Sequence, residues 1–89
     1  MHEFINEPVS VEVRLRQDGT LTPLAFVWGG RRLLVESWGR ESSETSDNGR
    51  ALHCYLVQTA GQETWQLCLN TEAAQWTLAR HWAPGNQVV

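Results

Sequence analysis

The chain has 89 residues, of which 42% are hydrophobic and 19% charged, and its formal net charge is −3. This length is that of one small domain (residues 1–89) with a single core, whose stability should be modest. The acidic balance argues against a protein that binds nucleic acid through bulk positive charge, although all seven basic residues are arginines.

Tryptophan is unusually frequent, and about one falls in each predicted strand. A tryptophan on a half-buried pleated surface supplies a large apolar body and one N–H group that needs a partner. This distribution predicts a small β core. The five residues are Trp28, Trp38, Trp65, Trp76 and Trp82.

The first predicted strand covers residues 9–16, where valine and leucine alternate with polar residues at period two. Asp18-Gly19 then predicts a hairpin turn. The second predicted strand covers residues 24–28, with Pro23 at its start. We expect three of its side chains to share one face: Leu24, Phe26 and Trp28.

Gly29-Gly30 predicts a second tight turn, because glycine adopts positive φ at both positions without strain. The third predicted strand covers residues 31–38 and is apolar on both faces near its start, with Leu34 and Trp38 on one of them. The polar, acidic segment 41–50 has no apolar residue and is expected to be a mobile loop.

Three further strands are predicted, at residues 51–59, 64–69 and 76–82, and residues 83–89 form a tail. Short connections between consecutive strands imply antiparallel neighbours. We therefore predict an all-β fold, a six-stranded antiparallel meander over residues 8–82, rolled into a small barrel or half-barrel. The expected core is Phe26, Trp28, Leu34, Tyr55, Val57, Trp65, Leu67, Trp76 and Leu78.

The N-terminus lacks the features of a signal peptide, and no apolar run is long enough to span a membrane, so we expect a cytoplasmic protein. A three-residue loop at 60–62 would place Cys54 opposite Cys68, so a cross-strand disulfide is conceivable. In a reducing compartment two packed thiols are expected instead. The spacing of these cysteines with His53 and His81 does not match a zinc site, so neither metal nor cofactor is expected.

Arginine beside aromatic residues is the one surface feature with functional content. Such pairs hold single-stranded nucleic acid by stacking and cation–π contacts, but the same arginines could pair with Glu12 and Glu36 across strands. No nucleophile-base arrangement typical of a hydrolase is found, so no enzyme is predicted. The candidate binding residues are Trp28, Arg31, Arg32, Trp38 and Trp82.

The stretch from Phe26 to Arg32 resembles the centre of a family of small bacterial domains of unknown function. The family pattern is Phe-x-Trp-x-Gly-Arg, a strand ending in Trp, a Tyr-x-Val strand and a closing Trp-x-Leu-x-Arg. This chain departs from it at Leu33, where an aromatic residue is usual, and in the short segment 35–40. The matches are Phe26, Trp28, Gly30, Arg31, Trp38, Tyr55, Val57, Trp76, Leu78 and Arg80.

Members of that family look like companions of error-prone DNA polymerases of the Y-family type. The resemblance therefore implies a role in bacterial DNA damage tolerance. We expect a non-enzymatic binding module with a protein partner, which could be a second copy meeting it through Trp82 and the Val88-Val89 tail. The alternatives are a weak single-stranded nucleic-acid-binding domain and a small enzyme.

Overall fold

The computed structural model describes residues 2–45, 49 and 51–83, and no helix occurs among them. None of these residues therefore forms a helix long and apolar enough to cross a membrane. The described residues form eight strands: β1 (His2–Val9), β2 (Val11–Leu15), β3 (Leu21–Trp28), β4 (Arg31–Leu34), β5 (Ser37–Thr45), β6 (Ala51–Thr59), β7 (Glu63–Asn70) and β8 (Gln75–Trp82).

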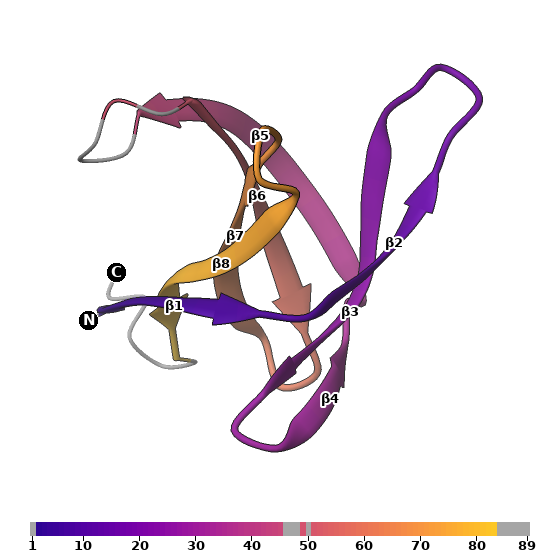
Figure 1. Cartoon of the computed structure of the whole chain (residues 1–89). Coiled ribbons are helices and arrows are strands. Elements are labelled where there is room, and N and C mark those ends of the chain that lie inside the picture. The colour runs from indigo at the N-terminus through magenta and orange to yellow at the C-terminus, as the bar shows by residue number, and fades with distance from the viewer. Residues whose placement is uncertain (1, 46–48, 50, 84–89) are drawn as a thin grey trace.

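The strands form two antiparallel sheets (Figure 1). One sheet has five strands in the order β1-β8-β7-β6-β5, and the other has three in the order β2-β3-β4. The predicted all-β class and antiparallel pairing are confirmed. The prediction of one six-stranded meander rolled into a barrel is wrong, because the strands divide between two sheets and neither sheet closes.

The backbone passes between the sheets at two corners. At the first, Val9 pairs with β8 and Val11 pairs with β3, while the carbonyl oxygen of Ser10 accepts a hydrogen bond from Val27 N at 3.0 Å. At the second, Val35 N donates to Leu24 O of β3, and the next residue, Glu36, donates to Gln58 O of β6. Strands that switch sheets in this way make the corners of orthogonally packed sheets.

These corners correct the predicted strand boundaries. The predicted strand 9–16 is divided at Ser10, and the predicted strand 31–38 is divided at residues 35–36. Strand β1 was missed because a bulge at Asn6, whose φ is 54°, interrupts the alternation of apolar residues.

The predicted mobile loop at 41–50 is also wrong over part of its length. Residues 41–45 belong to β5, an edge strand that pairs by its backbone and needs no apolar side chains. Residues 46–48 and 50, and the tail residues 84–89 with Val88-Val89, lie outside the described part of the chain.

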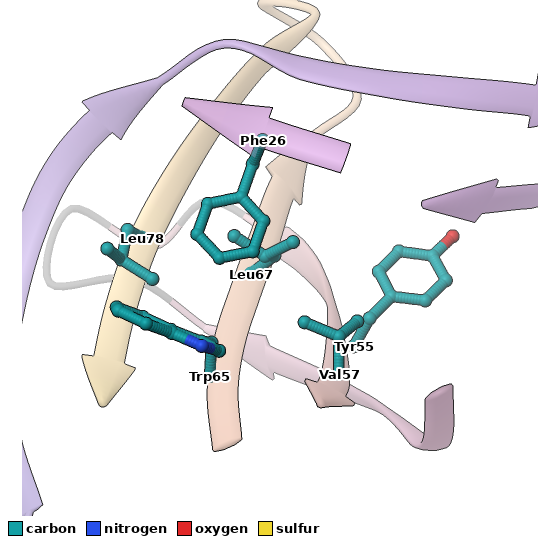
Figure 2. Packing of buried hydrophobic residues seen from close by; sticks show 6 residues of the cluster. All are labelled: Phe26, Tyr55, Val57, Trp65, Leu67 and Leu78. Atoms are coloured by element: carbon teal, nitrogen blue, oxygen red, sulfur yellow. The ribbon is translucent and has the colours of Figure 1, made fainter. Parts of the chain in front are cut away.

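The core lies between the two sheets, with Phe26 of β3 facing the inner side of the five-stranded sheet (Figure 2). The rings of Phe26 and Trp65 meet edge to face with centroids 5.3 Å apart. Trp65 Nε1 donates to Thr59 Oγ1 at 2.9 Å, so its one polar atom is satisfied. Six of the predicted core residues are confirmed as buried: Phe26, Tyr55, Val57, Trp65, Leu67 and Leu78.

Three predicted core residues behave differently. Trp28 and Trp76 are partly buried and pack against the edge of the core. Leu34 is 59% exposed, because Leu33 is the residue that stands opposite Phe26 on the core face. The predicted face of β3 is corrected in the same way, since Leu24 is the extra residue of a bulge and is exposed.

Cys54 and Cys68 are directly opposite each other in β6 and β7 and form a disulfide, with their Cα atoms 4.0 Å apart. The three-residue connection 60–62 gives the register that the sequence allowed. The expectation of two packed thiols is therefore wrong. Both cysteines are buried.

Replacement of Phe26 tests the arrangement of the core. Phe26→Ala should lower the free energy of unfolding by about 3–5 kcal/mol, because it leaves a cavity between the sheets. In a small domain this is a large share of the total. The control Leu15→Ala, at a position 70% exposed, should change it by less than about 0.5 kcal/mol. Urea denaturation measures both, and equal effects would contradict this core.

Reduction tests the disulfide. The bond closes a segment with a sequence separation of 14, and a loop of that size corresponds to about 3 kcal/mol of stabilisation in the chain-entropy description. A reductant should therefore lower the melting temperature of the wild-type protein. The double variant Cys54→Ala/Cys68→Ala should melt at the same temperature with and without reductant. A wild-type melting temperature that full reduction leaves unchanged would contradict this prediction.

Candidate functional site

Exposed apolar side chains gather in the three-stranded sheet. Its hairpin β2–β3 projects away from the five-stranded sheet (Figure 1). Among the described residues, the exposed large hydrophobic side chains of this sheet are Val13, Leu15, Leu24, Val27 and Leu34. A sixth, Trp38, lies at the start of β5 and contacts Arg16, which follows β2.

The two-residue turn Gly29-Gly30 decides which side chains of the sheet face outward. Both glycines have positive φ, 59° and 75°, and the turn places Trp28 opposite Arg31. We call the side of the three-stranded sheet that faces away from the core its outer face. By cross-strand register this face carries Glu12, Ala25, Val27, Arg32 and Leu34.

Glu12 and Arg32 form a two-point ion pair across the outer face. Arg32 Nε and Nη2 donate to the two carboxylate oxygens of Glu12 at 2.5 and 2.8 Å. The pair joins β2 to β4 and so passes over β3, where Ala25 is small enough to lie beneath it and is fully buried. The hydrogen bond from Arg32 holds the pKa of Glu12 below its ordinary value.

The predicted pairing of arginine with Glu12 is therefore confirmed for Arg32. Its guanidinium is already occupied by a carboxylate. Arg31 is exposed at the same turn, on the face of Trp28. Trp28 packs against the core and is only partly open to solvent. This turn does not present two free arginines beside an exposed indole ring.

Trp38 has a different setting. The guanidinium carbon of Arg16 lies 4.8 Å from the ring centroid of Trp38, and Arg16 Nε donates to Thr22 Oγ1 at 2.7 Å. Trp38 also lines a hollow of about 350 Å³ in the five-stranded sheet. The lining residues are Ser37, Trp38, Gly39, Leu56, Gln58 and Thr64.

Trp82, the last residue of β8, is partly buried and stands directly opposite Thr64, which lines this hollow. The structure thus divides the predicted binding residues between two places. Trp28, Arg31 and Arg32 lie at the β3–β4 turn, whereas Trp38 and Trp82 lie near the hollow.

Sequence reasoning missed five of the six lining residues: Gly39, Ser37, Leu56, Gln58 and Thr64. A signal for the first was present, since an isolated glycine inside a strand pattern is typical of a bulge. Gly39 and residue 40 stand together against Leu56, because Trp38 pairs with Val57 and Glu41 with Tyr55. The missing side chain at Gly39 leaves the hollow open.

The histidines and cysteines do not come together. The disulfide ties up both sulfurs, His53 Nε2 lies 3.0 Å from Glu41 Oε1, and His81 Nε2 lies 2.9 Å from Glu63 Oε1. The His81 ring also stacks on Trp65 with centroids 3.8 Å apart. Within the residues that the structure describes, no group of three His, Cys, Asp or Glu side chains could hold a metal ion.

A second hollow lies where β1 passes into β2, beside the β7–β8 turn. It is lined by residues 8–11 and by Ala74, Gln75 and Trp76. None of these side chains is charged. The same holds for the hollow at Trp38, which differs in that the arginine Arg16 lies over its tryptophan.

Comparisons of this chain with protein-family models, with curated proteins and with solved structures give no match. The family resemblance described above stays a prediction.

The Glu12–Arg32 pair predicts the titration of Glu12. In the folded protein the Glu12 carboxyl should titrate at a lower pH than an ordinary glutamate. The pair therefore stabilises the folded state at pH values above the ordinary pKa of glutamate, and this stabilisation is lost as the pH falls through the lowered pKa of Glu12. In Arg32→Gln the pKa of Glu12 should rise toward its ordinary value. Carboxyl-detected NMR titration of both proteins measures the difference, and equal pKa values would show that the pair does not form in solution.

Proposed function

We propose that this chain is a non-enzymatic binding module whose protein partner contacts the outer face of the three-stranded sheet. One observation carries the proposal: the two large apolar side chains of this face, Val27 and Leu34, are 42% and 59% exposed and lie on neighbouring strands. Single exposed apolar residues are ordinary, whereas a cluster of them within one element is typical of an interaction site.

The arrangement of the outer face supports this proposal. Val27 and Leu34 lie on neighbouring strands, and the Glu12–Arg32 pair lies beside them. Apolar side chains bordered by charged groups are the usual composition of a protein interface. The fixed ion pair would orient a partner more than it would add affinity.

Binding of single-stranded nucleic acid is the weaker candidate. Arg32 is neutralised by Glu12, Trp28 is partly buried, and a guanidinium already lies over the Trp38 ring. The net charge of −3 further reduces attraction to phosphates. We also propose that the partner acts in bacterial DNA damage tolerance and that the protein is cytoplasmic. These two parts of the proposal rest on the sequence alone.

Co-purification from the native cell tests the proposed surface. Val27→Asp/Leu34→Asp places two charges on the outer face, and Ser43→Asp/Thr71→Asp places the same charges at exposed positions elsewhere. We expect the control variant and the wild type to retain the same partner, and the outer-face variant to lose it. A partner retained equally by all three would contradict the proposed surface.

A labelled single-stranded oligonucleotide tests the second candidate. At ~50 mM salt, where phosphate contacts are strong, we expect at most weak binding measured by fluorescence anisotropy. Replacing Arg31 and Arg32 together by Ala should leave that binding nearly unchanged, because one of them is held by Glu12. Tight binding that the double variant abolishes would favour a nucleic-acid-binding domain.

A further inference from the structure

The hollow beside Trp38 is built by a bulge. Gly39 and residue 40 of β5 oppose Leu56 of β6, so the strand bends there and gains twist. A side chain at position 39 would meet open space, since no atom lies within 4 Å of an added Cβ. The hollow is therefore an accessible depression with Trp38 and Leu56 as its large apolar side chains.

The rim of the hollow is polar and ordered. Ser37 Oγ donates to Gln58 Oε1 at 3.1 Å, and Gln58 Nε2 donates to Thr64 Oγ1 at 3.5 Å. A volume of about 350 Å³ is at the small end of the range for ligand pockets. It fits one large apolar group surrounded by hydrogen-bonding partners.

One arginine, Arg16, contacts Trp38, which lines this hollow. Arg16 donates to Thr22 and lies over the ring of Trp38, and the carboxylate of Asp18 is near enough to interact with its charge. Arg14 of β2 is exposed and stands directly opposite Thr22, the residue that accepts the hydrogen bond from Arg16. Across the described residues, neither arginine forms an ion pair. The nearby Asp18 uses its Oδ1 atom to accept two hydrogen bonds from Thr20.

From this arrangement we infer that the hollow at Trp38 receives a large apolar side chain from an acidic segment of a protein partner, whose carboxylates meet Arg16 and Arg14. This inference deepens the proposed function and rests on it. The combination of an apolar pocket, a tryptophan and arginines is typical of the anchor points that dominate protein interfaces. Arginine also binds carboxylates in two-point geometry.

A short acidic segment fits this surface better than a nucleic acid does. A segment with two or three carboxylates needs only Arg14 and Arg16. The Trp38 ring already bears a guanidinium on it, which leaves less of its surface for stacking a base.

The test uses three labelled decapeptides as probes. The first contains Leu-Phe flanked on each side by two aspartates, the second has asparagines in place of the aspartates, and the third has Ala-Ala in place of Leu-Phe. Fluorescence anisotropy at ~50 mM salt should show binding of the first peptide, weakened by added salt. Both altered peptides should bind at least about tenfold more weakly.

Two variants of the protein locate the binding. Gly39→Ile fills the hollow at a position with open space, and Arg16→Gln removes one charge. Each variant should bind the first peptide at least about tenfold more weakly than the wild type does. Their matched controls, Ser43→Ile on the same edge strand and Arg31→Gln at another exposed turn, should stay within about twofold. Circular dichroism and thermal melting establish that every variant is folded.

The inference is overturned if the wild type does not bind the first peptide, or if Gly39→Ile and Arg16→Gln bind it like the wild type. It is also overturned if labelled oligothymidine competes with the peptide and shows the same response to both variants. If the native partner is lost by Val27→Asp/Leu34→Asp but retained by Gly39→Ile and Arg16→Gln, the proposed function stands and this inference fails.

Discussion

Two crossings of the backbone, at Ser10 and at residues 35–36, hold the three-stranded sheet over the five-stranded sheet. They deliver Phe26 to the inner side of the larger sheet, where its ring meets Trp65. Since a chain of this length buries only about 60–65% of its unfolded surface, much of the smaller sheet is left facing solvent. The exposed apolar residues follow from this geometry.

Bulges in β3 and β5 also shape the surface of the protein. An extra residue in β3 leaves Leu24 exposed, and an extra residue in β5 opens the hollow beside Trp38. Bulges sharpen the local twist and redirect side chains, and edge strands favour them because they also discourage unwanted pairing. In this protein the bulge on edge strand β5 forms the hollow for which we infer an apolar side chain of the partner.

The outer face of the three-stranded sheet and the hollow at Trp38 differ in charge. On the outer face, Arg32 is neutralised by Glu12, so Val27 and Leu34 offer mainly apolar contact. Beside the hollow, Arg16 contacts Thr22 and the ring of Trp38, and its charge also lies near that of Asp18. A partner that covers both surfaces would find apolar contact on the first and a positive charge at the second.

The sequence by itself indicated the all-β class, most of the strand residues, most of the turns and most of the core, because period-two alternation and glycine turns are local properties. The sequence also indicates which side chains of β4 face the core, because the two-residue turn at Gly29-Gly30 places Leu33 opposite Phe26. The sequence allowed Cys54 opposite Cys68 without deciding between a disulfide and two thiols. Tertiary structure alone decided the division into two sheets and the burial of Ala25 beneath the Glu12–Arg32 pair. These features depend on bulges and on pairing between distant segments, which leave no regular period in the sequence.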